Sequence, residues 1–322
     1  MDTTVIPVFF TIDNNFTKYV SVALQSLIDN VRADEKYHVI IIHQGLSTAN
    51  QQALLNMAND NVEIELSYLN ANLDAIQNRV ENYLRVDFFT LTIYYRLFIA
   101  DQFPQYDKAI YIDSDAVIPG NLADLYHMEL GNNLIAAAPD HSIEHVPSMI
   151  KYIQDALGIK DYHTYLNSGV LLINMKAFRD EKFVDHFLYL LNKYHFDCIA
   201  PDQDYLNMIC RGRILYLDEK WDAMPKAPEY ADEKVANPQI VHYNLFYKPW
   251  HFDNVMYEKY FWQYADETAF AKEIHAVKDN YTDAQRQADV EKLDNLMRKA
   301  ARLPATHNTF AKVAATGERI QL

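Results

Sequence analysis

Glycine is scarce in this sequence, with seven among 322 residues. None of the seven forms a GxGxxG or Walker sequence, the glycine-rich loops whose backbone amides commonly hold phosphate groups. The chain is also acidic, with a formal net charge of −15. An acidic protein without such a loop needs another positive charge to hold a diphosphate, and a metal ion provides one. Any nucleotide site in this protein is therefore expected to use a divalent metal.

Several other common features are missing. The first 260 residues contain no dense basic stripe, so nucleic acid is not an expected partner. The two cysteines, Cys198 and Cys210, form no CxxC pair, so neither a zinc site nor a disulfide framework is expected. No apolar run reaches the roughly 20 residues that span a bilayer, and no Lys or Arg precedes the apolar run within Met1–Phe10. These absences predict a cytoplasmic protein.

The sequence does contain enough apolar side chains for a large core. Hydrophobic residues make up 50% of the chain and charged residues 23%. This balance is typical of a compact globular protein and differs from that of a disordered chain. The length fits one large α/β domain followed by an extension.

Predicted strands and helices alternate along the first part of the chain. Buried strands are expected at Val5–Thr11, His38–His43, Val62–Leu69, Ala109–Ile112, Leu134–Ala138 and Gly169–Asn174. Helical spacing of apolar residues predicts helices at Val20–Val31, Thr48–Ala58 and Thr92–Ala100. Such alternation is typical of an α/β fold with a mostly parallel sheet flanked by helices.

The chain changes character from Thr268 onward. Residues 268–322 contain nine Lys/Arg and seven Asp/Glu, so they carry 9 − 7 = +2, whereas residues 1–267 carry 20 − 37 = −17. We therefore expect a domain at 1–267 and a helical extension at 268–322, with an amphipathic helix over Ala284–Ala301. The apolar face of this helix has two interpretations: it binds a partner, a second copy or the inner surface of the membrane, or it docks on the domain's own core.

The most informative local motif is Asp113-Ser114-Asp115, which follows the predicted strand Ala109–Ile112. In an extended chain, two carboxylates separated by one residue point the same way and offer oxygen ligands to Mg²⁺ or Mn²⁺. The pattern alone is common in acidic chains, and Asp202-Gln203-Asp204 is a second copy. The first copy is favoured as a metal site because it ends a buried strand, where charged residues are costly.

A second motif runs from His242 to His251, with the sequence HYNLFYKPWH. A neutral imidazole at His242 would complete a carboxylate metal site, and Lys248 would supply positive charge to a leaving diphosphate. Taken alone, an aromatic-rich stretch of this kind is more typical of a packed loop.

Taken together and in this order, the motifs between Ile6 and Trp262 resemble glycosyltransferase family 8, which includes bacterial lipopolysaccharide galactosyltransferases and glycogenin. The resemblance implies a GT-A fold, with Asp113, Asp115 and His242 as metal ligands and Ser114 beside the nucleotide. His242–Trp250 is similar to the family's HxxGxxKPW element, except that Leu245 stands where the family has glycine.

The resemblance also implies a set of donor-binding residues. Thr11, Asp13 and Asn15 would contact the uridine, Arg96 would lie near the donor sugar, and Lys248 would contact the diphosphate. The residues expected around the reacting sugar are Asp140, Asn167, Asp202 and Gln203.

The implied activity is transfer of a hexose from a UDP-sugar to a hydroxyl of a glycan, glycolipid or glycoprotein, with retention at the anomeric carbon and with Mn²⁺ or Mg²⁺ as cofactor. The hexose is glucose, galactose or an N-acetyl form. In that reaction Gln203 is expected beneath the anomeric carbon, Asp202 would orient sugar hydroxyls, and Lys248 would stabilise the leaving group.

Two other functions fit the same fold. One is a sugar-nucleotide or glycan-binding protein without catalysis, which a broken metal set would favour. The other is a nucleotidyltransferase, which is disfavoured because Thr11–Thr17 contains no glycine or basic residue to hold a triphosphate before Lys18.

Overall fold

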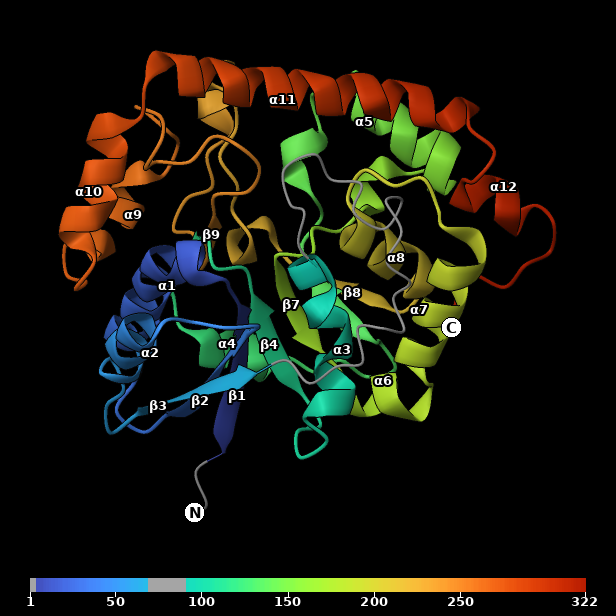
Figure 1. The fold of residues 1–322 in the computed structure, drawn as a ribbon. Helices are drawn as coiled ribbons and strands as arrows, with labels where there is room; N and C mark the ends of the chain where they lie inside the picture. The colour runs from blue at the N-terminus through green and yellow to red at the C-terminus, as the bar shows by residue number, and fades with distance from the viewer. Residues whose placement is uncertain (1–3, 69–90) are drawn as a thin grey trace.

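The computed structural model describes residues 4–68 and 91–322. A seven-stranded sheet forms its centre, with the strand order β3-β2-β1-β4-β7-β6-β8 (Figure 1). The strands are β1 Val5–Thr11, β2 Lys36–His43, β3 Val62–Tyr68, β4 Ala109–Ile112, β6 Ile135–Ala137, β7 Val170–Ile173 and β8 Ile214–Tyr216. Each lies within or close to an expected strand except β8, which the sequence analysis did not predict. Leu69, the last residue of the third expected strand, lies outside the described residues.

The sheet is mixed but mostly parallel, as predicted. β7 runs antiparallel to β4 and β6, while the other neighbouring pairs are parallel. The reversed direction of β7 places its beginning at the edge where β4 ends, and the backbone N–H of Asp113 donates to the carbonyl of Gly169 at 2.7 Å. Polar residues that precede β7 are thereby brought beside polar residues that follow β4.

Helices cover both faces of the sheet. They are α1 Thr17–Asp29, α2 Thr48–Leu55, α3 Tyr95–Gln102, α4 Leu122–Tyr126, α5 Pro147–Tyr152, α6 Met175–Asp180, α7 Phe183–Tyr194, α8 Pro201–Ile209 and α9 Glu258–Ala265. The three expected helices are present with shifted ends, and the third begins with a 3₁₀ turn at Leu91–Tyr94. A separate two-stranded sheet joins β5 Ala116–Val117 to β9 Val241–His242.

Alternation along the strands separates two hydrophobic clusters. In β1, Val8 and Phe10 pack with α1 and α2, whereas Phe9 packs on the opposite face with α3 and the helices that follow it. Strands that are buried on both faces have continuous apolar sequences, as β1 and β2 do. This burial explains why the apolar runs of the sequence predicted these strands correctly.

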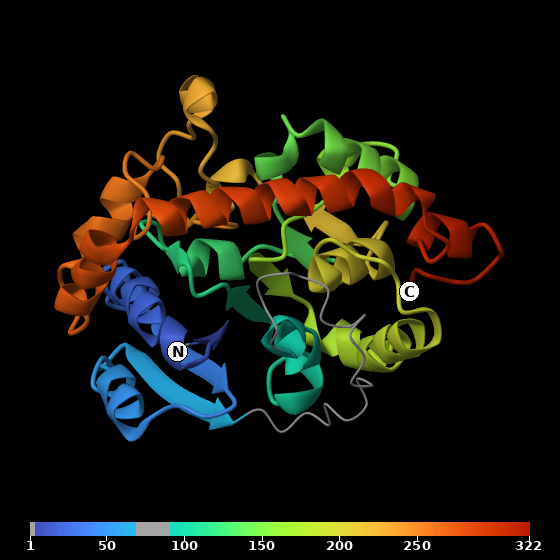
Figure 2. The same cartoon turned by 45° about the horizontal axis from the view of Figure 1, so that its top comes forward.

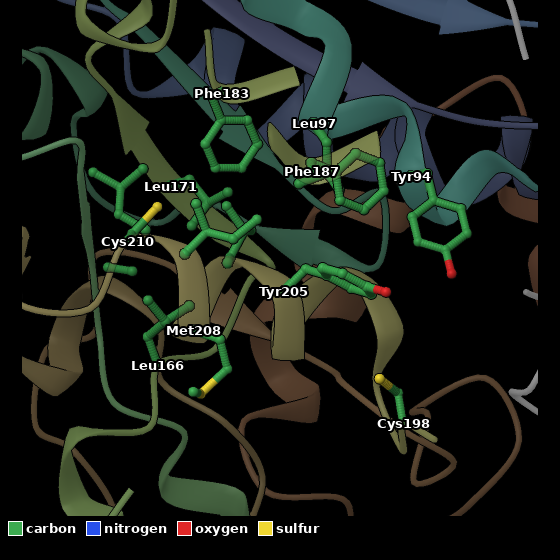
Figure 3. Close-up of a cluster of buried hydrophobic side chains, with 14 of the residues drawn as sticks. Tyr94, Leu97, Leu166, Leu171, Phe183, Phe187, Cys198, Tyr205, Met208 and Cys210 are labelled. Carbon is green, nitrogen blue, oxygen red and sulfur yellow. The ribbon is translucent and has the colours of Figure 1, made fainter. Parts of the chain in front are cut away.

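The cluster that contains Phe9 and residues of α3 is the larger of the two, and it also contains both cysteines. Figure 3 shows Cys198 and Cys210 among aromatic and aliphatic side chains from α3, β7, α7 and α8. Both are buried free thiols. They therefore act as small hydrophobic core residues.

The C-terminal extension forms three helices, α10 Ala271–Asn280, α11 Asp283–Arg302 and α12 Phe310–Ala314. α11 crosses the molecule from α10 to a position beside α5 (Figures 1 and 2). Leu296, Leu303 and Phe310 belong to the larger core cluster, and Phe310 stacks on Phe196 with ring centroids 3.8 Å apart. The amphipathic face is thus docked on the domain, which is one of the two interpretations that the sequence left open.

Among the helices in the described ranges 4–68 and 91–322, none has both the length and the apolar character needed to cross a bilayer.

The docking of the extension has a measurable consequence. Phe310→Ala should lower the free energy of unfolding by about 3–5 kcal/mol, because it removes a fully buried ring and leaves a cavity. Urea denaturation followed by circular dichroism measures this change. Gln287→Ala, at an exposed position of α11, should change stability by less than about 0.5 kcal/mol. An unchanged stability of Phe310→Ala would contradict the docking.

Candidate functional site

A cavity of about 450 Å³ lies at the carboxyl ends of β1 and β4. It gathers residues that are far apart in the sequence. The predicted site residues that line it are Thr11, Asp13, Arg96, Asp113, Ser114, Asp115, Asp140, Asn167, Asp202, Gln203, His242 and Lys248. Asn15 is the exception: it is exposed and lines a smaller neighbouring depression with Tyr19 and Trp250.

The small β5–β9 sheet brings the two sequence motifs together. Ala116 pairs with His242 in this sheet, and the backbone N–H of Tyr243 donates to the carbonyl of Asp115 at 3.0 Å. The imidazole of His242 is held in this way beside the carboxylates that follow β4.

Three ligand atoms converge in the cavity. Nε2 of His242 lies 3.3 Å from Oδ1 of Asp115 and 3.8 Å from Oδ2 of Asp113. The ligand atoms of the three residues all lie within 4.8 Å of one another. Two carboxylates and one imidazole at this separation are a donor set that a divalent metal ion accepts.

A fourth residue, Asp222, orients the imidazole. Its Oδ1 lies 3.1 Å from Nδ1 of His242, and its carboxylate is completely buried. Burial lowers the pKa of His242, but Asp222 and Asp115 outweigh that effect and raise the pKa to about 10. The electric field in this part of the cavity thus favours positive charge, as a cation site requires. Asp222 was not predicted as a site residue, because nothing in its local sequence marks it.

Two basic side chains flank the carboxylates. Nη2 of Arg96 lies 2.7 Å from Oδ1 of Asp113, and Nζ of Lys248 lies 2.5 Å from Oδ2 of Asp115. Burial raises the pKa of Asp113, and Arg96 opposes this rise without cancelling it. Burial alone would also raise the pKa of Asp115, but Lys248 and His242 hold it well below the usual range. Nη1 of Arg96 also donates to Oδ2 of Asp113 at 3.3 Å, so Arg96 contacts both oxygens of Asp113, whereas Lys248 and His242 lie near different oxygens of Asp115.

Tyr111 of β4 links this cluster to the end of β1. Its hydroxyl donates to Oδ1 of Asp113 at 2.7 Å and lies 2.9 Å from Oγ1 of Thr11. The guanidinium of Arg96 lies over the Tyr111 ring, 4.5 Å from its centroid. From the sequence, Tyr111 was predicted only as part of a buried strand.

A second polar network surrounds Gln203. Its Nε2 donates to Oδ2 of Asp140 at 2.9 Å, and its Oε1 accepts from the backbone N–H of Ser168 at 3.1 Å. Asn167 also donates to Oδ2 of Asp140, at 3.1 Å. The amide of Gln203 is therefore held at both ends.

Asp202 is paired with a buried cation. Its Oδ2 accepts from the hydroxyl of Ser168 at 3.0 Å and lies 3.2 Å from Nε of Arg96, an ion pair without hydrogen-bond alignment. Arg96 thus bridges Asp113 and Asp202. Ser168, which contacts Arg96, Asp202 and Gln203, is another residue that the sequence analysis did not single out.

The close approach of His242 to β7 depends on Gly169. A Cβ at this position would lie 2.1 Å from Cε1 of His242, far inside contact distance. Only glycine lets the imidazole occupy its place. In the sequence, Gly169 was interpreted only as the first residue of an expected strand.

Leu245, at the position of the family's glycine, adopts a left-handed backbone with φ of 54°. This conformation costs a residue with a Cβ about 1 kcal/mol or more. The departure from glycine therefore strains the backbone, and it adds an apolar side chain to the lining of the cavity.

The second Asp-x-Asp copy separates into two roles on α8. Asp202 faces the cavity, while Asp204 is buried in the core. Tyr152 and Tyr165 each donate to Asp204 at 2.7 Å, and the backbone N–H groups of Ile199 and Ala200 add two more hydrogen bonds. Burial raises the pKa of Asp204 to about 6, although these donors oppose the rise.

The C-terminal extension contacts the segment that follows Lys248. Nε of Arg286 donates to the carbonyl of His251 at 2.8 Å, and Lys278 pairs with Asp253 at 2.7 Å. The rings of His251 and Tyr281 stack with centroids 3.8 Å apart. These contacts hold the segment that follows Lys248. Charge and amphipathicity in the sequence did not indicate them.

A second cluster consists of Glu144, His145 and Glu233, of which His145 lines the cavity. Nζ of Lys226 lies 3.1 Å from Glu233 and 3.6 Å from Glu144. This cluster has its own counter-charge and needs no metal ion.

A mostly parallel sheet with paired aspartates after a central strand is typical of a GT-A glycosyltransferase. The sequence model of glycosyl transferase family 8 matches residues 7–254, so the chain belongs to that family.

Known proteins of this kind are similar over half to three quarters of the chain. The lipopolysaccharide 1,2-glucosyltransferase of Escherichia coli K12 is 24% identical over 261 residues, which cover 76% of this chain and 72% of that protein. The glycosyltransferase GlyA of Streptococcus pneumoniae serotype 4 is 31% identical over 165 residues, covering 49% of this chain and 21% of that protein. The chain thus matches about a fifth of the length of GlyA.

Solved structures agree in fold. The galactosyltransferase LgtC, in complex with donor and acceptor sugar analogs, has a TM-score of 0.67 at 25% identity, covering 82% of this chain and 96% of LgtC. The bifunctional glycosyltransferase WbbM has a TM-score of 0.71 at 22% identity, covering 86% of this chain and 52% of WbbM.

The buried position of Asp204 leads to a stability prediction. Asp204→Asn should lower the free energy of unfolding by about 2 kcal/mol or more, since an amide NH₂ would replace an oxygen that only accepts hydrogen bonds. Urea denaturation measures the loss. Asp232→Asn, on the exposed surface, is the matched control and should be neutral. A stable Asp204→Asn variant would show that the four hydrogen bonds do not contribute as described.

Proposed function

We propose that this protein is a metal-dependent, retaining hexosyltransferase that uses a UDP-sugar donor and a hydroxyl of a glycan, glycolipid or glycoprotein as acceptor. The observation that carries the proposal is the convergence of Asp113, Asp115 and His242 between Arg96 and Lys248. The names of its relatives, a lipopolysaccharide glucosyltransferase and a galactosyltransferase, support a hexose as the transferred group.

The residues fit a divalent cation such as Mn²⁺ or Mg²⁺. The oxygens of Asp113 and Asp115 that are nearest His242 have the spacing of ligands, and Asp222 holds Nδ1 of His242 so that Nε2 faces them. A bound cation would supply positive charge to the diphosphate, which the acidic chain otherwise lacks.

Lys248 and Arg96 assist the departure of UDP. Breaking the bond between the sugar and the diphosphate leaves negative charge on the phosphate oxygen, and fixed positive groups stabilise that charge as it develops. Lys248 is held beside Asp115 and the carbonyl of Tyr243. Its ammonium group is thereby kept at the metal side of the cavity.

The environment of Gln203 favours attack from the face that UDP leaves. The amide is a weak nucleophile, and the nearby Asp202 is already engaged by Arg96 and Ser168. Neither group is well placed to form a lasting covalent bond to the sugar. In a front-face reaction the acceptor oxygen bonds to the anomeric carbon, and its proton passes to the departing phosphate oxygen on the same face.

Orientation of the donor falls to the remaining residues. Asp140 and Asn167 form the network around Gln203, where sugar hydroxyls would bind. Oδ1 of Asp13 accepts hydrogen bonds from the backbone N–H groups of Asn15 and Phe16, so Oδ2 is available to the uridine. Thr11 and Ser114 line the same part of the cavity.

The alternative is a sugar-nucleotide or glycan-binding protein without catalysis. The intact set of aspartates and histidine favours the enzyme, since simple binding of a sugar would not need a buried lysine beside the metal ligands.

Donor hydrolysis tests the proposal. With Mn²⁺ present, one of UDP-glucose, UDP-galactose or their N-acetyl forms should release UDP slowly without an acceptor, and EDTA should abolish the release. Asp115→Asn should lower the rate by about 100-fold or more, because the charge on the leaving group loses its stabilisation. Asp232→Asn serves as the control. UDP affinity that is equal with Mn²⁺ and with EDTA would refute the metal role.

The contact between Asp222 and His242 gives a separate prediction. Asp222→Ala should weaken Mn²⁺ affinity by about 10–100-fold, because the imidazole loses the partner that fixes its orientation. Asp222→Asn, which keeps an acceptor oxygen, should weaken it less. Titration of Mn²⁺ followed by electron paramagnetic resonance reports affinity independently of turnover. Unchanged affinity in both variants would rule out an orienting role.

A further inference from the structure

The cavity is lined by two chemically different groups of side chains. One group consists of the acidic and basic residues described above. The other consists of aliphatic and thioether side chains from separate parts of the chain, here called the apolar wall: Ile143, Val146 and Met149 around α5, Leu245, and Leu293, Leu296 and Met297 of α11.

We propose that the apolar wall binds an alkyl chain attached to the acceptor sugar, so that the acceptor is a glycolipid. This inference rests on the proposed transferase function and narrows its acceptor to one class. Three residues of the apolar wall, those on α11, lie outside the part of the chain that the family model matches, because α11 begins after residue 254.

The donor is not a suitable ligand for the apolar wall. Uridine, diphosphate and hexose all carry groups that need hydrogen bonds, and burying such groups without partners is costly. The hydrogen-bonding side chains, such as those of Asp140 and Gln203, belong to the polar network around Gln203. In the apolar wall, Leu, Ile and Val offer no hydrogen bonds, and Met offers only a weak acceptor.

The apolar wall is held in place by packing and by anchors at both ends of α11. Met149 and Leu296 are buried in the core, and the hydroxyl of Ser148 contacts Sδ of Met297 at 3.7 Å. At its other end, α11 is tied to the segment after Lys248 by Arg286. Figure 2 shows α11 passing across the molecule beside α5. The surface is therefore formed before any ligand binds.

Part of the apolar wall remains uncovered. Val146, Leu293 and Met297 line the cavity and are only half-buried, so part of each side chain is in contact with water. Leu245 adds to this surface despite a backbone conformation that favours glycine. A ligand that removes half-buried apolar side chains from water is bound with a favourable hydrophobic free energy. An alkyl chain meets this requirement, and its attached sugar would extend toward Gln203.

Matched acceptors test the inference in the protein of residues 1–322. Methyl and octyl β-galactosides and β-glucosides would be compared as acceptors, with the octyl compounds kept below micelle-forming concentrations. Burial of several methylene groups should lower KM for the octyl compound by about 10-fold or more relative to the methyl compound. Equal KM values would overturn the inference while leaving hexosyl transfer in place.

Substitutions locate the effect. Leu293→Ser and Met297→Ser should reduce the ratio of the two KM values to about 2-fold or less, because each replaces an apolar contact with a hydroxyl. Asp294→Ser, at an exposed position of α11, should leave the ratio unchanged. If all three variants keep the wild-type ratio, the alkyl chain binds elsewhere and the inference is wrong.

A binding measurement needs neither turnover nor a variant. With ¹³C-labelled methionine methyl groups, octyl glycoside should shift the signals of Met149 and Met297, and methyl glycoside should not. The test remains valid if no UDP-sugar is hydrolysed, an outcome that would count against the proposed function alone. Signals that respond equally to both glycosides would overturn the inference.

Discussion

The site depends on one electrostatic constraint: two carboxylates, Asp113 and Asp115, are held together at the buried end of β4. Like charges at this spacing repel strongly where water is excluded. The fold answers with positive groups from three distant segments, Arg96 from α3, His242 from β9 and Lys248 from the following loop. The same concentration of negative charge that is unfavourable for stability favours positive charge in this part of the cavity.

That constraint explains the less conspicuous features around it. His242 reaches the carboxylates because Gly169 leaves room, and it keeps its orientation because Asp222 accepts at its other nitrogen. Arg96 is shared with Asp202 and rests against Tyr111. Gly169, Asp222 and Tyr111 therefore position the positive groups that surround the two carboxylates.

Much of the fold followed from the sequence, since strands buried on both faces need long apolar runs that are visible locally. The direction of β7 was not visible, because it depends on how the chain returns to the sheet. In the site, the two motifs could be read directly, whereas Asp222 and Ser168 act through side chains that are distant in sequence. The two Asp-x-Asp copies have the same sequence pattern. In the second copy both aspartates lie in α8, and the helical geometry turns Asp202 and Asp204 toward different surroundings. An amphipathic helix likewise shows that it has an apolar face but not what covers that face.

The position of α11 has a consequence for how the protein is made. The helix is synthesised after the core residues and the cavity residues on which it packs. A nascent chain therefore exposes an apolar surface until α11 has left the ribosome, and at that stage it is most open to aggregation or chaperone capture. Completion of the cavity is coupled to the synthesis of α11, so a chain that stopped before this helix would lack a finished cavity as well as part of its core.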